Sequence, residues 1–186
     1  SLALRAVTSP GDTVIVESPA YFGVLLLLQE LRLKAVEVPT LPQTGFSIEA
    51  LRTALALHRV KACVAAFNCH NPLGFVTTDE AKREIVELLA RHEVPLIEDE
   101  VYGDLAFGDV RARPAKAFDR HGLVLYCSSF SKTIAPGYRV GWIAGGHWSN
   151  WILTHTDRFK AISSGAGTSN WISMYAQSDV QRNRQF

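Results

Sequence analysis

Residues 128–142, "SSFSKTIAPGYRVGW", combine side chains that could do covalent chemistry beside a bound phosphate. Lys132 follows a run of serines, and Arg139 stands seven positions further on. Hydroxyl groups and the planar guanidinium fork both hydrogen-bond phosphate oxygens, and a lysine amine can attack an electrophilic carbon. A solvated surface lysine needs no such setting. The stretch therefore predicts a reactive lysine next to a phosphate group.

Other side chains capable of chemistry follow three further apolar segments. They supply two phenols, two carboxyls, an amide and an imidazole, from Tyr21, His70, Asn71, Asp99, Glu100 and Tyr102. Taken singly, each has an ordinary explanation, such as a helix cap for a carboxylate, a rim position for a tyrosine or a turn for an asparagine before proline. A lone lysine or arginine is most often solvated or in a weak ion pair. His70 fits a loop histidine or a donor that supports a neighbouring residue.

Taken together, these groups match the needs of one cofactor. In open α/β sheets, ligands bind beyond the carboxyl ends of the strands, and each group follows a strand-like segment. Pyridoxal 5′-phosphate needs a lysine for its aldehyde, a carboxylate for its ring nitrogen, and arginine with hydroxyls for its phosphate. The combined set predicts a site for this cofactor and no metal site.

Strand-like and helix-like segments alternate along the chain, which is typical of a parallel α/β sheet. Continuous apolar character predicts strands covered on both faces, at residues 13–18, 34–39, 61–67, 94–99, 123–128 and 140–145. Helical periodicity predicts helices at residues 22–33, 47–59, 77–93 and 148–162. In the third helix, Thr77 and Glu80 have capping-box spacing, and Ile85, Leu88 and Leu89 form an apolar stripe.

The composition indicates a globular protein without a polyanionic or membrane partner. The chain has 186 residues, of which 47% are hydrophobic and 20% charged. Its net charge is +1, and no five-residue block of like charge favours nucleic acid or an anionic membrane. Three cysteines without CxxC spacing suit reduced thiols, and the longest apolar run is too short to span a bilayer. We therefore expect a cytoplasmic chain.

Three motifs resemble those of a known family. They are "HNPLG" (70–74), the spacing of Asp99 and Tyr102 in "DEVY", and "SFSKTIAPGYRVGW" (129–142) with Lys132 and Arg139. In this order, over residues 2 to about 160, they resemble the large domain of fold-type I, class I/II aminotransferases. The sequences of the segments "IEDEVYGDLAFGD" and "ESPAYFG" are most similar to those of the MocR-type branch. In that branch a similar domain follows a GntR-like winged helix and senses an effector for a transcription regulator.

The resemblance implies an α/β fold with a mainly parallel central sheet flanked by helices. Residues 1–165 would form the pyridoxal-phosphate-binding large domain without its first strand and its phosphate loop. Residues 166–186 match the family poorly and would begin a missing C-terminal part. Because the arginine that grips the substrate carboxylate lies in that missing domain, we expect weak or no turnover from this chain alone. The full-length parent would be a homodimer.

The resemblance also assigns roles to individual residues. Lys132 would form the internal aldimine with pyridoxal phosphate, and Asp99 would keep the pyridine nitrogen protonated. Tyr102 and Asn71 would hydrogen-bond the phenolate oxygen. Tyr21 would stack on the ring face.

The phosphate group and the proton transfer have assigned residues too. Ser129, Ser131 and Arg139 would hold the phosphate, and Gly137 would permit a close backbone approach. Once an amino acid displaces Lys132, the freed amine would act as general base at the α-carbon, so Lys132 and the supporting Asp99 and Tyr102 form the catalytic set.

Several functions remain open on the sequence alone. The first is an aminotransferase that moves an amino group between an amino acid and a 2-oxo acid. The second is an effector-sensing domain of a transcription regulator with little or no turnover. A lyase or decarboxylase on the same scaffold is a third, because the electron sink serves several bond cleavages. An α/β module without a cofactor is the plain structural alternative.

Overall fold

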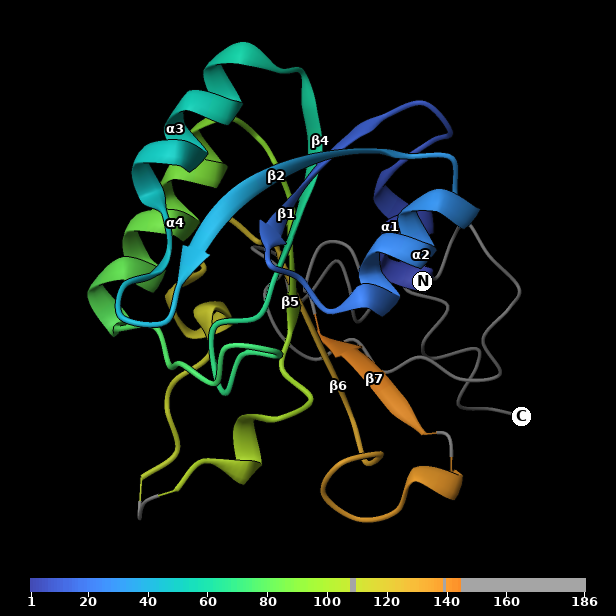
Figure 1. Cartoon of the computed structure of the whole chain (residues 1–186), viewed down its shortest axis with the longest axis vertical. Helices are drawn as coiled ribbons and strands as arrows, with labels where there is room; N and C mark the ends of the chain where they lie inside the picture. Colours follow the sequence, from blue (N-terminus) through green and yellow to red (C-terminus); the bar gives the residue numbers. More distant parts are fainter. Residues whose placement is uncertain (108–109, 139, 145–186) are drawn as a thin grey trace, which may run out of the picture.

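Seven strands form one sheet in the computed structural model, which describes residues 1–107, 110–138 and 140–144. Their order across the sheet is β3-β2-β1-β4-β5-β6-β7 (Figure 1). The strands are β1 (Thr13–Ser18), β2 (Lys34–Leu41), β3 (Gly45–Phe46), β4 (Val60–Ala65), β5 (Leu96–Asp99), β6 (Val124–Ser129) and β7 (Gly141–Ala144). The five inner strands are parallel, whereas the edge strands β3 and β7 are antiparallel to their neighbours. The predicted mainly parallel sheet is confirmed, and the short β3 is an addition to it.

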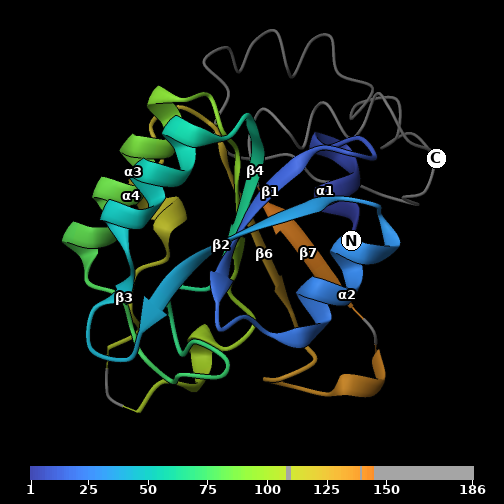
Figure 2. The same cartoon turned by 45° about the horizontal axis from the view of Figure 1, so that its top comes forward.

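Helices cover both faces of this sheet. They are α1 (Leu2–Val7), α2 (Phe22–Glu30), α3 (Ile48–Leu57) and α4 (Asp79–Arg91), with short 3-10 helices η1 (Gly103–Leu105), η2 (Ala115–Phe118) and η3 (Pro136–Tyr138). α1 and α2 lie on one face, and α3 and α4 lie on the other (Figures 1 and 2). The helix predicted at 148–162 lies outside the described residues. In the described part of the chain, no helix is long and apolar enough to cross a membrane.

Each inner strand contributes to two hydrophobic cores because its side chains alternate between the faces. Val14 and Val16 of β1 belong to the core under α1 and α2, whereas Ile15 belongs to the core under α3 and α4. This two-sided burial explains why the strands read as continuous apolar runs. In β5 the same alternation places Glu98 on the α4 side and Asp99 on the α1 side of the sheet.

The start of α4 differs by one residue from the capping box that the sequence predicts. The N-cap is Thr78, whose hydroxyl accepts the Ala81 N–H at 3.2 Å, and Thr77 is buried before it. Thr77 is drawn inward because its own N–H donates to the Phe67 carbonyl at 2.7 Å. The predicted apolar stripe of this helix is buried as expected.

Candidate functional site

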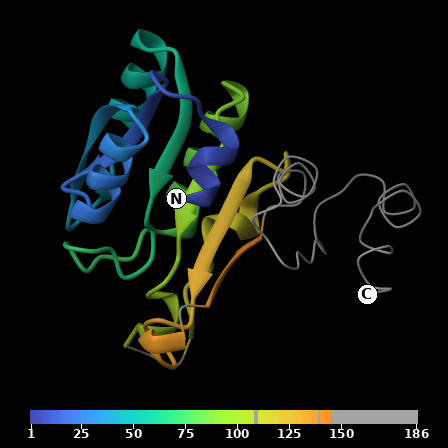
Figure 3. The ribbon, with the colours of Figure 1, turned by 90° about the vertical axis from the view of Figure 1, so that its right-hand side faces the viewer.

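The loops after β4, β5 and β6 begin at the same edge of the sheet, because these strands are parallel neighbours and their carboxyl ends lie side by side. Figure 3 shows the loops after β5 and β6 next to each other below the strands. Tyr102 follows β5, Lys132 follows β6, and Asn71 follows β4. The sheet therefore brings together residues that lie far apart in the sequence.

Lys132, Tyr102 and Asn71 form a chain of contacts across these three loops. The Lys132 amine lies 5.4 Å from the centroid of the Tyr102 ring, within the range of a cation–π contact. The Asn71 side-chain amide donates a long hydrogen bond of 3.4 Å to the Tyr102 hydroxyl. Lys132 is exposed, and no hydrogen bond or ion pair of its amine occurs within the described residues. Its amine is therefore available to a ligand.

Asp99 is the last residue of β5, and its carboxyl is mostly withdrawn from solvent. Burial raises the pKa of this carboxyl, and the Val101 N–H, 3.4 Å from Oδ1, counteracts the shift. A cationic partner would favour the charged form of the group. No contact joins Asp99 to Lys132 in the described part of the structure, so the ligand would have to span them.

The candidate phosphate residues are only partly described. Ser129 ends β6, and its hydroxyl accepts the Ser131 N–H at 3.3 Å. Arg139 lies outside the described residues. The expectation for Gly137 stays a prediction; a Cβ there would meet none of the described protein atoms within 4 Å, so no close protein contact requires glycine at this position. The close backbone approach occurs at Gly141, where a Cβ would lie 2.9 Å from the Ser128 carbonyl oxygen of the paired strand.

Tyr21 precedes α2, and its ring folds back on its own helix. A Cβ at position 23 would lie 2.4 Å from Tyr21 Cε1, so only Gly23 leaves room for the ring. The ring also lies 4.8 Å from that of Phe22 and is 44% exposed. It belongs to the loop after β1, and the described structure gives it no contact with Lys132 or Tyr102.

A buried polar network behind the site has no counterpart in the sequence predictions. Lys82 of α4 is fully buried, and its amine donates to Asn68 Oδ1 at 2.6 Å and to the Arg113 carbonyl at 2.7 Å. Asn68 donates in turn to Glu100 Oε1 at 2.8 Å. Burial lowers the pKa of Lys82 and raises that of Glu100. The burial of Lys82 could have been predicted from the sequence, because Lys82 stands on the apolar stripe of α4, three positions before Ile85.

Two further buried carboxyls, those of Glu98 and Glu17, were assigned no role from the sequence. Glu98 is 0% exposed and accepts the N–H groups of Ala115 at 2.6 Å and Lys116 at 2.9 Å. Burial raises its pKa to about 7. Glu17 at the end of β1 contacts His70, whose position beside Asn71 was already noted.

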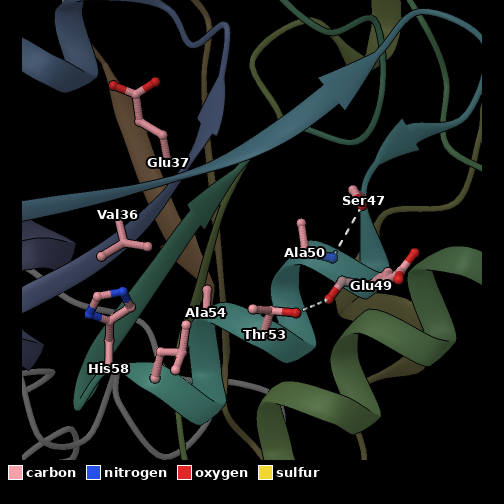
Figure 4. A pocket seen from close by; sticks show the side chains of 9 residues that line it. Val36, Glu37, Ser47, Glu49, Ala50, Thr53, Ala54 and His58 are labelled. Atoms are coloured by element: carbon pink, nitrogen blue, oxygen red, sulfur yellow. Dashed lines mark hydrogen bonds between the residues drawn. The ribbon is translucent and has the colours of Figure 1, made fainter.

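A separate groove lies on the other half of the sheet, between β2 and α3 (Figure 4). Its volume is about 460 Å³. It is lined by Val36, Glu37, Ser47, Glu49, Ala50, Thr53, Ala54, Leu57 and His58. None of these residues belongs to the predicted set, and the groove is open, so it is not the candidate site.

Comparisons with known proteins identify the family and agree with the fold. The family model "Aminotransferase class I and II" matches residues 1–182. This chain belongs to that aminotransferase family. The relative "Uncharacterized HTH-type transcriptional regulator YdcR" of Escherichia coli is 51% identical over 146 residues, which are 78% of this chain and 31% of the relative. "Aromatic-amino-acid aminotransferase 1" of Thermococcus litoralis is 31% identical over 145 residues, 75% of this chain and 34% of that protein.

A solved aminotransferase shares the fold. The Pyrococcus horikoshii kynurenine aminotransferase, solved with PMP, superposes with a TM-score of 0.75 and 28% identity, over 82% of this chain and 39% of its own. The chain thus spans about a third of the length of its curated aminotransferase-family relatives. This family is dependent on pyridoxal phosphate.

The described residues fit this cofactor chemically. A lysine amine without a partner among the described residues, a largely buried carboxyl, an amide and phenol in contact, and two hydroxyls lie at the ends of neighbouring strands or in the loops that follow them. Asn71 and Tyr102 could hold the phenolate oxygen, Asp99 the ring nitrogen, and Ser129 with Ser131 the phosphate.

Proposed function

We propose that this chain binds pyridoxal 5′-phosphate through Lys132 and serves, in the full-length protein, as the cofactor domain of an aminotransferase. The observation that supports it best is the contact of Lys132, Tyr102 and Asn71 across three loops in an aminotransferase fold. The substrates would be an amino acid and a 2-oxo acid, and the working assembly a homodimer. Residue roles beyond these contacts, including those of Tyr21 and Arg139, belong to the proposal.

The chemistry divides between the cofactor and the protein. Pyridoxal phosphate supplies an aldehyde for amines and a ring that accepts an electron pair from the substrate α-carbon. The Asp99 carboxylate would keep a proton on the ring nitrogen, because an ion pair with the protonated nitrogen would offset the cost of withdrawing the carboxylate from water. The exposed Lys132 amine would hold the cofactor aldehyde until the amine of an incoming amino acid displaces it, and the freed amine would then move a proton between two carbons, because its donors are not committed elsewhere in the described structure.

A second function has its own support. The regulator YdcR is more similar in sequence to this chain than the Thermococcus aminotransferase is, with 51% against 31% identity. The same site could therefore bind the cofactor and an amino acid to signal, with little or no turnover. In that case the full-length gene must also encode a helix-turn-helix segment.

A product assay on the full-length protein separates these functions. The protein, loaded with pyridoxal phosphate, is given amino acids and 2-oxoglutarate, and new 2-oxo acid, amine and ammonia are measured. An aminotransferase produces a 2-oxo acid that Lys132→Ala abolishes, whereas amine or ammonia indicates a decarboxylase or lyase. A sensor changes the cofactor's visible band on adding an amino acid but makes no product. If the wild-type protein neither binds the cofactor nor forms any product, the proposal is wrong.

A further inference from the structure

Glu17 and His70 form a buried polar pair that the proposed function leaves without a role. His70 Nε2 lies 3.2 Å from Glu17 Oε2, and the two side chains are 0% and 7% exposed. The two atoms are close, but their geometry is not that of an aligned hydrogen bond. Glu17 Oε2 also accepts the Ala66 N–H at 3.0 Å, and Oε1 has no partner within the described residues. Withdrawing these groups from water costs free energy, so a compensating function is expected.

His70 makes the central contacts of the turn that carries Asn71. Its Nδ1 atom accepts the Leu73 N–H at 3.2 Å, and its ring stacks on Phe75 with centroids 4.5 Å apart. Its backbone N–H donates to the Phe75 carbonyl at 3.1 Å. Because Nδ1 is an acceptor, the neutral ring carries its proton on Nε2, which faces Glu17.

We propose that Glu17 holds His70, and through it the turn at residues 70–75, so that the Asn71 amide is directed at the phenolate oxygen of pyridoxal phosphate. This inference rests on the proposed function. Glu17 and His70 are positioning residues, because they act through Asn71. The Asn71 contact to Tyr102 is already long at 3.4 Å, so a small displacement of the turn would break it.

Three titratable groups on neighbouring elements interact electrostatically with Glu17. They are His70, Cys63 of β4 and Asp99 of β5. Burial raises the pKa of Glu17, His70 opposes the shift, and Asp99 adds to it. A change at Glu17 therefore alters the charge near Asp99 as well as the turn. Charge-neutral changes at His70 separate the two effects.

Two substitutions of His70 form a matched pair. His70→Asn keeps an acceptor near the place of Nδ1 but is too short to reach Glu17. His70→Gln reaches Glu17 with an amide donor but lacks the Nδ1 acceptor. Glu17→Met keeps most of the volume but removes Oε2, the oxygen that both approaches His70 Nε2 and accepts the Ala66 N–H.

The test is the pH midpoint of the visible band of the full-length protein loaded with pyridoxal phosphate. Asn71→Ala should move the midpoint to higher pH, because a phenolate without its donor holds the neighbouring proton more tightly. We expect His70→Asn and Glu17→Met to give at least half of that shift, and His70→Gln to give less. Val86→Ala, in the core under α4, lowers stability without touching the turn and should leave the midpoint unchanged.

The possible outcomes separate this inference from the proposed function. Midpoints of His70→Asn and Glu17→Met equal to wild type would overturn the positioning role, and so would an unmoved midpoint in Asn71→Ala. If the wild-type protein shows no band, the proposed function itself fails. Thermal melts accompany each variant, and if a His70 variant does not fold, Glu17→Met decides alone.

Discussion

Lys132 and Lys82 occupy opposite environments in the same domain. Lys132 is exposed on the loop after β6, with its amine 5.4 Å from the Tyr102 ring. Lys82 is fully buried in α4, and acceptors at 2.6 and 2.7 Å bind its amine. An amine that must form and break a covalent bond and carry a proton cannot be saturated by its own protein. The comparison teaches that the setting of the amine, and not the residue type, distinguishes a reactive lysine from a structural one.

The largest expected effect comes from removing the buried amine. Lys82→Met leaves Asn68 Oδ1 and the Arg113 carbonyl without their donor inside the protein. The free energy of unfolding should fall by about 3 kcal/mol, in the range for breaking a buried charged contact. Urea denaturation at neutral pH measures it. A variant as stable as wild type would show that the network is not structural.

Two asparagines sharpen the comparison, because they stand three positions apart in one loop. Asn68 is 2% exposed and joins Lys82 to Glu100, so Asn68→Ala should lower the free energy of unfolding by about 2 kcal/mol. Asn71→Ala loses only a long contact to Tyr102 and should cost less than about 1 kcal/mol. The same urea titrations test both, and equal losses would contradict the division between structure and site.

Stability should also depend on pH through Glu98. Its folded-state pKa of about 7 lies above the unfolded value, so the folded state holds more protons in the window between them. The stabilisation present at low pH is therefore lost as pH rises from about 4.3 to about 7, by up to about 1.4 kcal/mol per unit. Glu98→Gln should flatten this slope in denaturation curves taken across that window. An unchanged slope would assign the pH dependence to other carboxyls.

The smallest stability effect is expected at Lys132, the proposed cofactor-binding lysine. Lys132→Met removes an exposed amine without a hydrogen bond in the described structure, so the free energy of unfolding should stay within about 0.5 kcal/mol of wild type. The same variant should lose the visible band of bound pyridoxal phosphate. A large loss of stability would show that Lys132 is a structural residue like Lys82.

Patterns within one segment made much of the fold predictable. The strand at 13–18 and the burial of Ile85, Leu88 and Leu89 follow directly from apolar continuity and helical period. The grouping of Lys132, Tyr102 and Asn71 was predictable too, because parallel strands place their carboxyl ends at one edge.

The features that the sequence did not reveal depend on contacts between side chains or backbone groups of different elements. Glu17 stands at the end of an apolar strand, and only the packed sheet shows that it meets His70. Adjacent threonines were both plausible caps, and the inward hydrogen bond of Thr77 decided for Thr78. Gly141 needs to be glycine because the antiparallel pairing of β7 with β6 leaves no room for a Cβ beside the Ser128 carbonyl oxygen.

The most direct test of the central claim is to trap the cofactor and find its attachment site. The full-length protein is incubated with pyridoxal phosphate at low ratio, reduced with borohydride, digested and analysed by mass spectrometry. The account predicts a phosphopyridoxyl group on Lys132 and none on Lys82. A label spread over surface lysines, or located on another single lysine while Lys132 stays unmodified, would contradict it.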